Sequence, residues 1–535
     1  MKIKCALLFL FVFSKVTYSQ IVFERQYSST SLNSGFGYGS QLLLLPDSGY
    51  MFVNTEYTSN HDSLLIGRLD KVGNVKWVKQ VGDNSEIYNI SAALSTQGLL
   101  YVTYSTEPPN TSYYCSVVIE MDLTGNIIWS KAYGEKGISA YSKYIFVRSS
   151  SLYIIGENTD SGYSEYGGAY NLYFLKLDTA GNFKFGKALN AGGMDYSRAA
   201  LQLKNSDILI SGLTTDSLFD KYESLFRVDT SGNIIWEKRY HVTGYKEFNG
   251  QALNECSDGS LIITGHVDSI PLMGFGKWDI SLMKLSSSGN FYWAKFYGGT
   301  SFDEAWTVML TNDKGYMLAA EPESYGGVSR IGLLKTDSLG NFSWMRLYGE
   351  SSGGFPNNTV KNYDQGYTIF ATNGSYNVDA PMLLIRTDSS GNSTCTNTNK
   401  ELPQRSFVPI EDSVLYTSNL SGSISFTPNS INYPLTPIDL CSSTSGIANV
   451  ATDNELQVYP DPFDKWFTTE IKQQKMGIAS FELYDINGNI IYSENKNITT
   501  DDFSTQIRIE NISKGIYFLD VRIGNERITT KLIKQ

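Results

Sequence analysis

The stretch from Asp337 to Trp344, DSLGNFSW, carries the pattern that sets the fold of most of this chain. An Asp-x-x-Gly-Asn turn separates an apolar strand that ends at Lys335 from a strand led by Trp344. The aspartate can accept backbone N–H groups of the turn, and glycine takes positive φ without steric cost. We therefore predict a tight antiparallel hairpin at this point.

The same Gly-Asn turn occurs seven times, at intervals of 51 to 57 residues. In six copies an aspartate stands three residues before the glycine, and Ser286 replaces it in the fifth. Each repeat continues with two further strands joined by a second tight turn. Four short strands in about 50 residues are typical of one propeller blade. The seven turn glycines are Gly73, Gly125, Gly181, Gly232, Gly289, Gly340 and Gly391.

The two ends of the repeat region complement each other. After the last turn no aromatic strand follows, but Phe23–Tyr27 near the N-terminus matches Trp293–Tyr297 of a complete repeat. We predict that this N-terminal strand completes the last blade beside residues 349–388, which closes seven blades into one propeller without open edges. An open solenoid of the same repeats is the alternative.

Composition agrees with an all-β chain of more than one domain. The sequence has 36 Tyr, 27 Phe and 47 Gly in 535 residues, and only 18% of its residues are charged. Such a chain favours short aromatic-rich strands joined by glycine turns. Residues 21–395 resemble several bacterial propeller families with Asp-x-x-Gly-Asn-x-x-Trp repeats, including exported proteins with no assigned activity. That resemblance implies architecture only.

Residues 1–19 have the pattern of a cleaved signal peptide, so we expect the mature chain to begin at Gln20. Lys2 and Lys4 precede an apolar run, Ala6–Phe13, that is shorter than the roughly 20 residues of a spanning helix. The mature chain then has 40 basic and 54 acidic side chains, a net charge near −14. We expect no nucleic-acid partner and no transmembrane segment once the signal peptide is removed.

A different pattern follows a polar linker after Cys441. Val458–Phe463 reads VYPDPF, Gly515–Val521 reads GIYFLDV, and the chain ends in KLIKQ at 531–535. This segment resembles the type A sorting domain of the type IX secretion system of Bacteroidetes, although that family usually has Asn where this chain has Asp461. The residues that carry the resemblance are Tyr459, Pro460, Pro462, Phe463, Gly515, Tyr517, Lys531 and Lys534.

The resemblance implies a small immunoglobulin-like sandwich that the type IX translocon of the outer membrane reads as an address. It also implies passage through the periplasm, followed by secretion or attachment at the cell surface. An ordinary β-sandwich with a binding role of its own is the alternative. The predicted fold class is therefore all-β, a seven-bladed β-propeller followed by a small immunoglobulin-like β-sandwich.

The predicted parts of the chain differ in role. Cys395 and Cys441 flank the segment between the two domains, and in an exported protein they are the plausible disulfide pair, whereas Cys115 and Cys256 lie in different blades and should stay free. The predicted domains are a signal peptide at 1–19, the propeller at 20–395, a disulfide-tied extension and linker at 396–445, and the sorting domain at 446–535.

Binding residues are expected on one face of the propeller. Successive strands of a blade run antiparallel, so the tight turns of all repeats share one face and the long loops share the other. Loops on a rigid scaffold are where binding residues concentrate, so we place the ligand-binding surface on the long-loop face. The candidate binding residues there are Tyr163, Tyr166, Trp278, Asp303, Trp306 and Tyr325.

No motif indicates a catalytic site, a metal or a cofactor. The mature chain has three histidines, without an HExxH motif, a phosphate loop or cysteines at zinc spacing. We expect a binding or adhesion module for an unidentified glycan or protein. The alternative is a secreted enzyme that uses two carboxylates to cleave polysaccharide. We favour binding because similar carboxylates recur in several blades. The carboxylates available to the enzyme are Glu165, Asp195, Asp279, Asp303, Glu304, Glu321 and Glu323.

Overall fold

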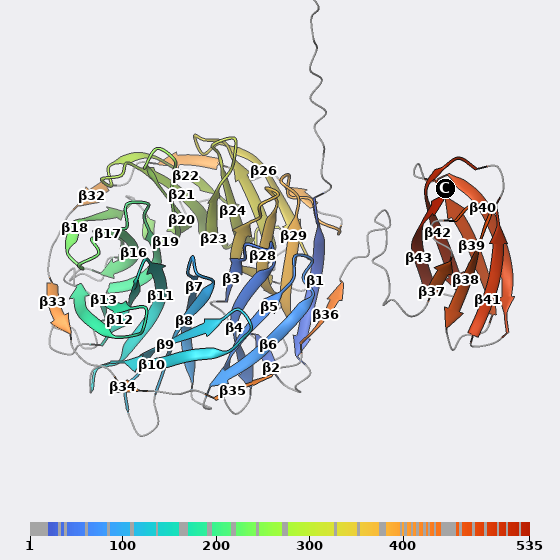
Figure 1. Cartoon of the computed structure of the whole chain (residues 1–535). Coiled ribbons are helices and arrows are strands. Elements are labelled where there is room, and N and C mark those ends of the chain that lie inside the picture. The colour runs from blue at the N-terminus through green and yellow to red at the C-terminus, as the bar shows by residue number, and fades with distance from the viewer. Residues whose placement is uncertain are drawn as a thin grey trace, which may run out of the picture. The chain divides into compact units, whose positions relative to one another are not determined.

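A computed structural model of the chain is built from β-strands joined by turns and loops (Figure 1). Two compact units, residues 1–441 and 442–535, divide the chain. The described part contains no helix, and hence none that is long and apolar enough to cross a membrane, and the predicted all-β class is confirmed. The structure describes residues 20–534 except 30–33, 37–39, 59–61, 83–85, 108–111, 135–136, 160–169, 190–194, 216–220, 242–244, 270–276, 326–328, 350–353, 374–380, 396–397, 401–403, 408–409, 413–416, 421–423, 426–428, 433–434, 440–455, 460–462, 473–476, 486–488, 500–501, 510–511 and 524–525. The predicted signal peptide lies outside the described residues.

The first unit holds antiparallel sheets, each formed mainly by four strands in chain order. In one sheet the fourth strand comes from the N-terminus, and in another β2 is an added strand. The sheets are β3 (Gln41–Leu44), β4 (Tyr50–Thr58), β5 (Asp62–Leu69) and β6 (Val75–Gly82) with β2 (Ser34–Phe36); β7 (Ile87–Leu94), β8 (Leu99–Thr106), β9 (Cys115–Asp122) and β10 (Ile127–Tyr133); β11 (Ala140–Arg148), β12 (Ser151–Asn158), β13 (Asn171–Asp178) and β14 (Phe183–Leu189); β15 (Asp195–Gln202), β16 (Ile208–Thr215), β17 (Lys221–Val228) and β18 (Ile234–His241); β19 (Tyr245–Glu255), β20 (Leu261–Ser269), β21 (Trp278–Leu285) and β22 (Phe291–Tyr297); β23 (Asp303–Leu310), β24 (Tyr316–Pro322), β25 (Ile331–Thr336) and β26 (Phe342–Tyr348); and β27 (Gly354–Lys361), β28 (Tyr367–Asn373) and β29 (Met382–Thr387) with β1 (Phe23–Ser29).

These sheets pack side by side in the order of the chain and form a propeller-like array around a common centre (Figure 1). The first strand of the last sheet, β27, also contacts β3 of the first sheet. The predicted pairing of the N-terminal strand is confirmed, because β1 lies antiparallel to β29 with Phe23 opposite Arg386 and Tyr27 opposite Met382.

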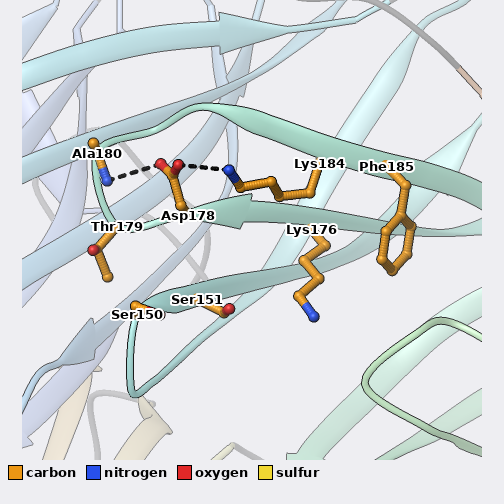
Figure 2. Close-up of a pocket in the computed structure, with 8 residues that line it drawn as sticks. All are labelled: Ser150, Ser151, Lys176, Asp178, Thr179, Ala180, Lys184 and Phe185. Atoms are coloured by element: carbon orange, nitrogen blue, oxygen red, sulfur yellow. Dashed lines mark hydrogen bonds and ion pairs between the residues drawn. The ribbon is translucent and has the colours of Figure 1, made fainter.

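Six of the seven repeat turns are closed by their own aspartate, and in the fifth the Ser286 hydroxyl accepts the backbone N–H of Asn290. In the turn between β13 and β14, Asp178 Oδ1 accepts the backbone N–H of Ala180 at 3.0 Å (Figure 2). It also accepts the backbone N–H of Asn182 at 2.8 Å. The Lys184 ammonium lies 2.9 Å from Oδ2, and together with these backbone donors it holds the pKa of Asp178 well below its usual range. Gly181 has φ 73°, as the predicted turn chemistry requires.

An aromatic side chain of each sheet covers the turn glycine of the next sheet. A Cβ on Gly340 would lie 2.6 Å from the ring of Trp293, so only glycine fits beneath that ring. Tyr297, on the same strand as Trp293, is fully buried and donates its hydroxyl to the Gly340 carbonyl at 2.5 Å. We call this combination the aromatic clamp. The ring and glycine pairs are Phe23 and Gly73, Trp77 and Gly125, Trp129 and Gly181, Phe185 and Gly232, Trp236 and Gly289, Trp293 and Gly340, and Trp344 and Gly391.

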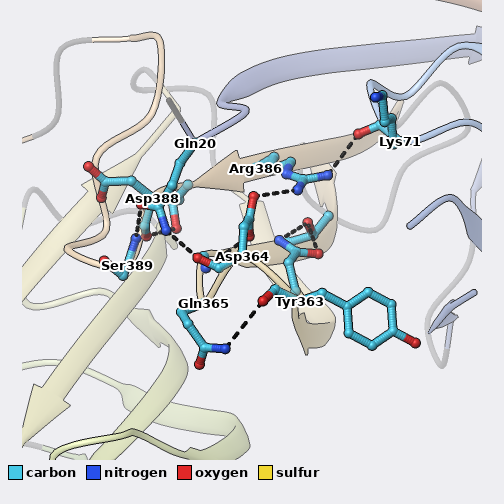
Figure 3. A network of polar contacts seen from close by, with 12 residues as sticks. Gln20, Lys71, Tyr363, Asp364, Gln365, Arg386, Asp388 and Ser389 are labelled. Atoms are coloured by element: carbon cyan, nitrogen blue, oxygen red, sulfur yellow. Dashed lines mark hydrogen bonds and ion pairs between the residues drawn. The ribbon is translucent and has the colours of Figure 1, made fainter. Parts of the chain in front are cut away.

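Arg386 on β29 links the last sheet to the first (Figure 3). Its buried guanidinium donates to the Lys71 carbonyl at 2.7 Å and to the Tyr50 hydroxyl at 2.8 Å, and it forms an ion pair with Asp364 at 2.7 Å. Lys71 and Tyr50 belong to the β3–β6 sheet, whereas Asp364 belongs to the last sheet. These contacts fix how the two sheets meet, because loss of a partner would leave the buried charge of Arg386 without full compensation.

The described strands between residues 398 and 439 form an outer belt, which our reading of the sequence did not foresee. Seven short strands of the belt pair antiparallel with the outermost strands β26, β22, β18, β14, β10, β6 and β1, in that order (Figure 1). Each belt strand covers an edge that would otherwise present unpaired backbone groups. The belt strands are β30 (Thr398–Lys400), β31 (Gln404–Phe407), β32 (Ile410–Asp412), β33 (Thr417–Leu420), β34 (Ile424–Ser425), β35 (Asn429–Asn432) and β36 (Leu435–Asp439).

The start and the end of the belt both reach β1. The backbone N–H of Cys395 donates to the Glu24 carboxylate, and β36 pairs with β1 next to Arg25. A disulfide from Cys395 to Cys441 would close the belt into a covalent loop, but Cys441 lies outside the described residues and the disulfide stays a prediction. The two buried cysteines that are free thiols, as predicted, are Cys115 and Cys256.

The second unit is a two-sheet sandwich. One sheet has the order β37-β38-β41 and the other β40-β39-β42-β43. Phe463, Phe467, Phe481 and Leu519 are buried in the core of this unit, as expected for a small β-sandwich. Its strands are β37 (Leu456–Tyr459), β38 (Trp466–Lys472), β39 (Gly477–Tyr484), β40 (Ile490–Ile498), β41 (Asp502–Arg508), β42 (Gly515–Ile523) and β43 (Glu526–Lys534).

The aromatic clamp predicts the effect of removing one hydroxyl. Tyr297→Phe keeps the ring but leaves the buried Gly340 carbonyl without the hydroxyl that it accepts, so the free energy of unfolding should fall by about 1–2 kcal/mol. Tyr292→Phe on the same strand is the control, since the Tyr292 side chain is 56% exposed. Urea denaturation of the full chain measures both. Equal stability of the two variants would contradict a structural role for the clamp.

Candidate binding face and central cavity

A cavity of about 620 Å³ lies at the centre of the first unit, lined by the first-strand region of all the sheets. In six of these strands the pairing register shifts at an equivalent place. Such β-bulges leave one residue unpaired and redirect its side chain. The bulged residues, all of which line the cavity, are Asn89, Lys143, Arg198, Gln251, Trp306 and Asn357.

Side chains of the preceding sheet bind the backbone at the bulges. Glu157 Oε1 accepts the N–H of Ser197 at 2.6 Å, and Glu223 Oε2 accepts the N–H of Gly250 at 2.7 Å. A bulge breaks the local ladder of hydrogen bonds, so a buried N–H needs a partner from elsewhere. Recurring carboxylates at this level therefore hold one sheet to the next.

Five tyrosine rings form a continuous row at the ends of strands to which the long loops attach. Successive ring centroids lie 5.4, 5.1, 6.2 and 5.2 Å apart. Tyr88 is 43% exposed, and the other four are half-buried. The rings lie at or just before the starts of β7, β9, β11, β13 and β15, which belong to three neighbouring sheets. The tyrosine row consists of Tyr88, Tyr114, Tyr141, Tyr170 and Tyr196.

The tyrosine row was not predicted from the sequence, because binding residues were expected in the long loops. Tyr88, Tyr141 and Tyr196 each stand close before a bulge, at the same place in three successive repeats. This recurrence was visible in the sequence. The two intervening rings come from residues just before β9 and β13, whose proximity only the packing of the sheets establishes.

A second cluster lies on the same face, where β20 ends and β23 begins. Glu304 is buried and accepts a hydrogen bond from Gln251 Nε2 at 3.0 Å, and its Oε1 lies 2.6 Å from His266 Nδ1. The His266 ring stacks on Trp278 with centroids 4.1 Å apart and an angle of 6°. Trp278 and Glu304, both considered in the sequence analysis, thus belong to one packed cluster.

Glu321 stands directly opposite Glu304 on the neighbouring strand. Burial raises the pKa of Glu321 to about 7, and the negative charges of Glu304 and Glu323 add to the shift. Trp306 Nε1 donates to Glu321 Oε2 at 3.2 Å. A carboxyl group that exchanges a proton near neutral pH, beside a second carboxylate, has the properties of a general acid or base.

Asp303 has a role within the protein. Its fully buried carboxylate accepts the backbone N–H of Gly299 at 2.8 Å and the hydroxyl of Ser324 at 2.5 Å. Burial raises the pKa of Asp303. The side chain therefore fastens two loop segments to each other and is not presented to solvent.

The remaining predicted binding residues do not form one site. Trp306 lines the central cavity. Tyr325 packs toward the belt, where the Lys400 ammonium lies 5.7 Å from its ring centroid. Among the described residues no group of side chains could hold a metal ion. The predicted residues that lie outside the described part are Tyr163, Glu165 and Tyr166.

The sequence motif of the C-terminal unit brings its two ends together. The backbone N–H of Phe463 donates to the carbonyl of Ile533 at 2.8 Å, and Lys534 forms an ion pair with Asp464 at 3.1 Å. Tyr517 is buried and donates its hydroxyl to a backbone carbonyl, whereas Tyr459, Gly515 and Lys531 are exposed. Pro460 and Pro462 lie outside the described residues.

Residues 457–535 match the family model described as secretion system C-terminal sorting domain. The C-terminal unit carries this sorting domain. The resemblance noted from the sequence is thereby confirmed, and a sorting domain of this family implies export through the type IX secretion system. The match begins within the second unit and extends to the end of the chain.

The chain is similar to solved structures at a low level of identity. No curated protein matches the sequence. A crystal structure of the polysaccharide lyase Uly1 has 10% identity and a TM-score of 0.41, and the match covers 66% of this chain and 90% of the lyase. A point mutant of the NanB sialidase from Streptococcus pneumoniae has 10% identity and a TM-score of 0.40, and the match covers 68% of this chain and 70% of the sialidase. The extracellular region of plexin A4 has 10% identity and a TM-score of 0.44, and the match covers 97% of this chain and 77% of the plexin chain.

The raised pKa of Glu321 predicts that Glu321→Gln increases the free energy of unfolding by an amount that depends on pH. The ionised form is disfavoured in the folded state, so the cost to wild-type stability grows as the pH rises from about 4.5 to about 7 and is constant above that. At pH 8 the variant should be more stable than wild type by about 1–3 kcal/mol, and this advantage should vanish at pH 4. Denaturation at the two pH values measures it, with Glu107→Gln as control. An advantage that is the same at both pH values would show that ionisation is not its cause.

Proposed function

We propose that the first unit is a closed seven-bladed β-propeller that binds an extracellular glycan or protein on its long-loop face. The sorting domain delivers it to the cell surface or the medium. The domain limits that we propose are the signal peptide at 1–19, the propeller at 20–395, the disulfide-tied extension and linker at 396–445, and the sorting domain at 446–535.

Contacts at every junction support closure of the propeller. An aromatic clamp ring covers each of the seven turn glycines, and the ring over Gly73 belongs to Phe23 of the N-terminal strand. Tyr27 of that strand donates its hydroxyl to the Gly73 carbonyl at 2.5 Å. A ring thus joins the last blade to the first as rings join the others, and the hydroxyl bond recurs at Gly181, Gly289, Gly340 and Gly391. An open solenoid would not need these contacts between the last blade and the first.

The tyrosine row is the observation that carries the binding function. Aromatic rings that are half-exposed and contiguous over three sheets are costly to leave in water and recur at binding surfaces. The clamps and the belt hold these sheets rigidly, so little order is lost when a ligand binds. The central cavity, beside the same strands, adds polar groups to the surface.

A binding screen of the purified full chain against glycans and proteins tests this function. We expect Tyr170→Ala to weaken binding of the selected ligand at least about tenfold, which corresponds to about 1.4 kcal/mol. Tyr363→Ala is the control, because Tyr363 is 61% exposed and lies at a tight turn on the opposite face. If both variants bind like wild type, the tyrosine row is not the binding surface.

A polysaccharide-cleaving enzyme is the second candidate, and the pKa of Glu321 is the observation that favours it. Glycoside hydrolysis needs two carboxyl groups beside the bond that is cleaved, and Glu304 and Glu321 lie opposite each other. Both groups are engaged by their neighbours, so we rank binding first. Release of reducing ends from a bound polymer, abolished in Glu321→Gln, would reverse this ranking.

The export role predicts the fate of a truncated chain. Removing residues 450–535 in the native host should leave a folded propeller in the periplasm, because the division into two units leaves the first unit with its own core. Fusing these residues to a passive periplasmic protein should carry it to the surface or the medium. Fractionation with immunoblotting measures both. Unchanged surface levels of the truncated protein would assign the C-terminal unit another role.

A further inference from the structure

The central cavity has a charge opposite to that of the whole protein. Two charged side chains line it, Lys143 and Arg198, and both are cations. No carboxylate is among the described residues that line the cavity, although the mature chain has a net charge near −14. The two cations occupy the bulges of neighbouring sheets, so the same backbone device directs both into one side of the cavity.

Lys143 has a counter-ion, whereas none of the described carboxylates forms an ion pair with Arg198. The Lys143 ammonium lies 2.5 Å from Glu157 Oε1, which also accepts the N–H of Ser197. The Nε of Arg198 is buried and has no hydrogen-bond partner among the described residues. A guanidinium in this position is preorganised to bind a carboxylate through two parallel hydrogen bonds.

We propose that the central cavity binds the carboxylate of an acidic saccharide, with Arg198 as the principal contact. This inference rests on the proposed binding function and names the class of its ligand. The tyrosine row supports it, because Tyr141 and Tyr196 each precede one of the two cations by two residues on the same strand. A chain that lies along the row would therefore place an acidic sugar unit over the cavity.

The lining of the cavity favours a saccharide over an acidic peptide. Asn89, Gln251, Asn254 and Asn357 supply amide donors and acceptors around the wall, which suit a ligand rich in hydroxyl groups. Trp306 contributes an aromatic ring to the same wall. A volume of about 620 Å³ also lies in the range of small-ligand pockets, which is roughly 300–1,000 Å³.

Titration calorimetry with the full mature chain tests the proposal. The probes are trigalacturonic acid, sialyllactose, neutral galactotriose and hexaglutamate. Arg198→Gln should weaken the binding of one or both acidic sugars at least tenfold and leave neutral sugar binding unchanged, while Arg198→Lys should retain more of the affinity. Lys314→Gln, which removes an exposed cation at a tight turn, is the matched control and should bind like wild type. Thermal unfolding of each variant checks that it is folded.

The outcomes separate this inference from the function on which it rests. Acidic sugar binding that is unchanged in folded Arg198→Gln, but lost in Tyr170→Ala, overturns the carboxylate site and leaves the glycan-binding function standing. Hexaglutamate binding as tight as the sugars, with the same dependence on Arg198, overturns the choice of a saccharide. If neither acidic sugar binds to wild type, the inference fails, whatever other ligand the screen identifies.

Discussion

The aromatic clamp is the interaction on which the rest of the first unit depends. A ring such as Trp293 can lie against the next sheet only because Gly340 has no Cβ and takes positive φ. The buried hydroxyl of Tyr297 then adds a directional bond to the same residue. Because each clamp joins the outer strand of one sheet to a turn of the next, the spacing between sheets is set locally and repeated around the array.

The ends of the chain complete what the repeats begin. The N-terminal strand supplies the last missing ring and hydroxyl, and Arg386 fixes the same junction with three partners from both sheets. The belt then covers the outer edges of the sheets. Edge strands with unpaired backbone groups invite association with other chains, which is a particular hazard for an exported protein.

The repeated frame and the variable positions have different tasks. Glutamates that recur near the bulges, such as Glu157 and Glu223, accept backbone N–H groups of the next sheet and so hold the frame. The bulged side chains themselves are free to differ from repeat to repeat. Lys143, Arg198 and Trp306 show this variation at one level of the cavity, and it is there that a ligand can be distinguished.

The sequence by itself determined the features that depend on local chemistry or on spacing along the chain. The Asp-x-x-Gly-Asn turns are closed by bonds within a few residues, the repeat interval gives the succession of four-stranded sheets, and the match of Phe23–Tyr27 to a complete repeat gives its place in the last sheet. The C-terminal motif likewise identified the sorting domain.

Only the tertiary structure decided the belt and the composition of the binding face. The belt strands are two to five residues long, too short to show alternation, and they become strands because outer edges of the sheets offer them partners. The tyrosine row, the His266 contact with Glu304 across 38 residues and the raised pKa of Glu321 all depend on packing between strands. The physical reason is that side chains of different sheets become neighbours, and lose contact with water, only when the sheets pack. The repeat period does not encode which side chains this packing brings together.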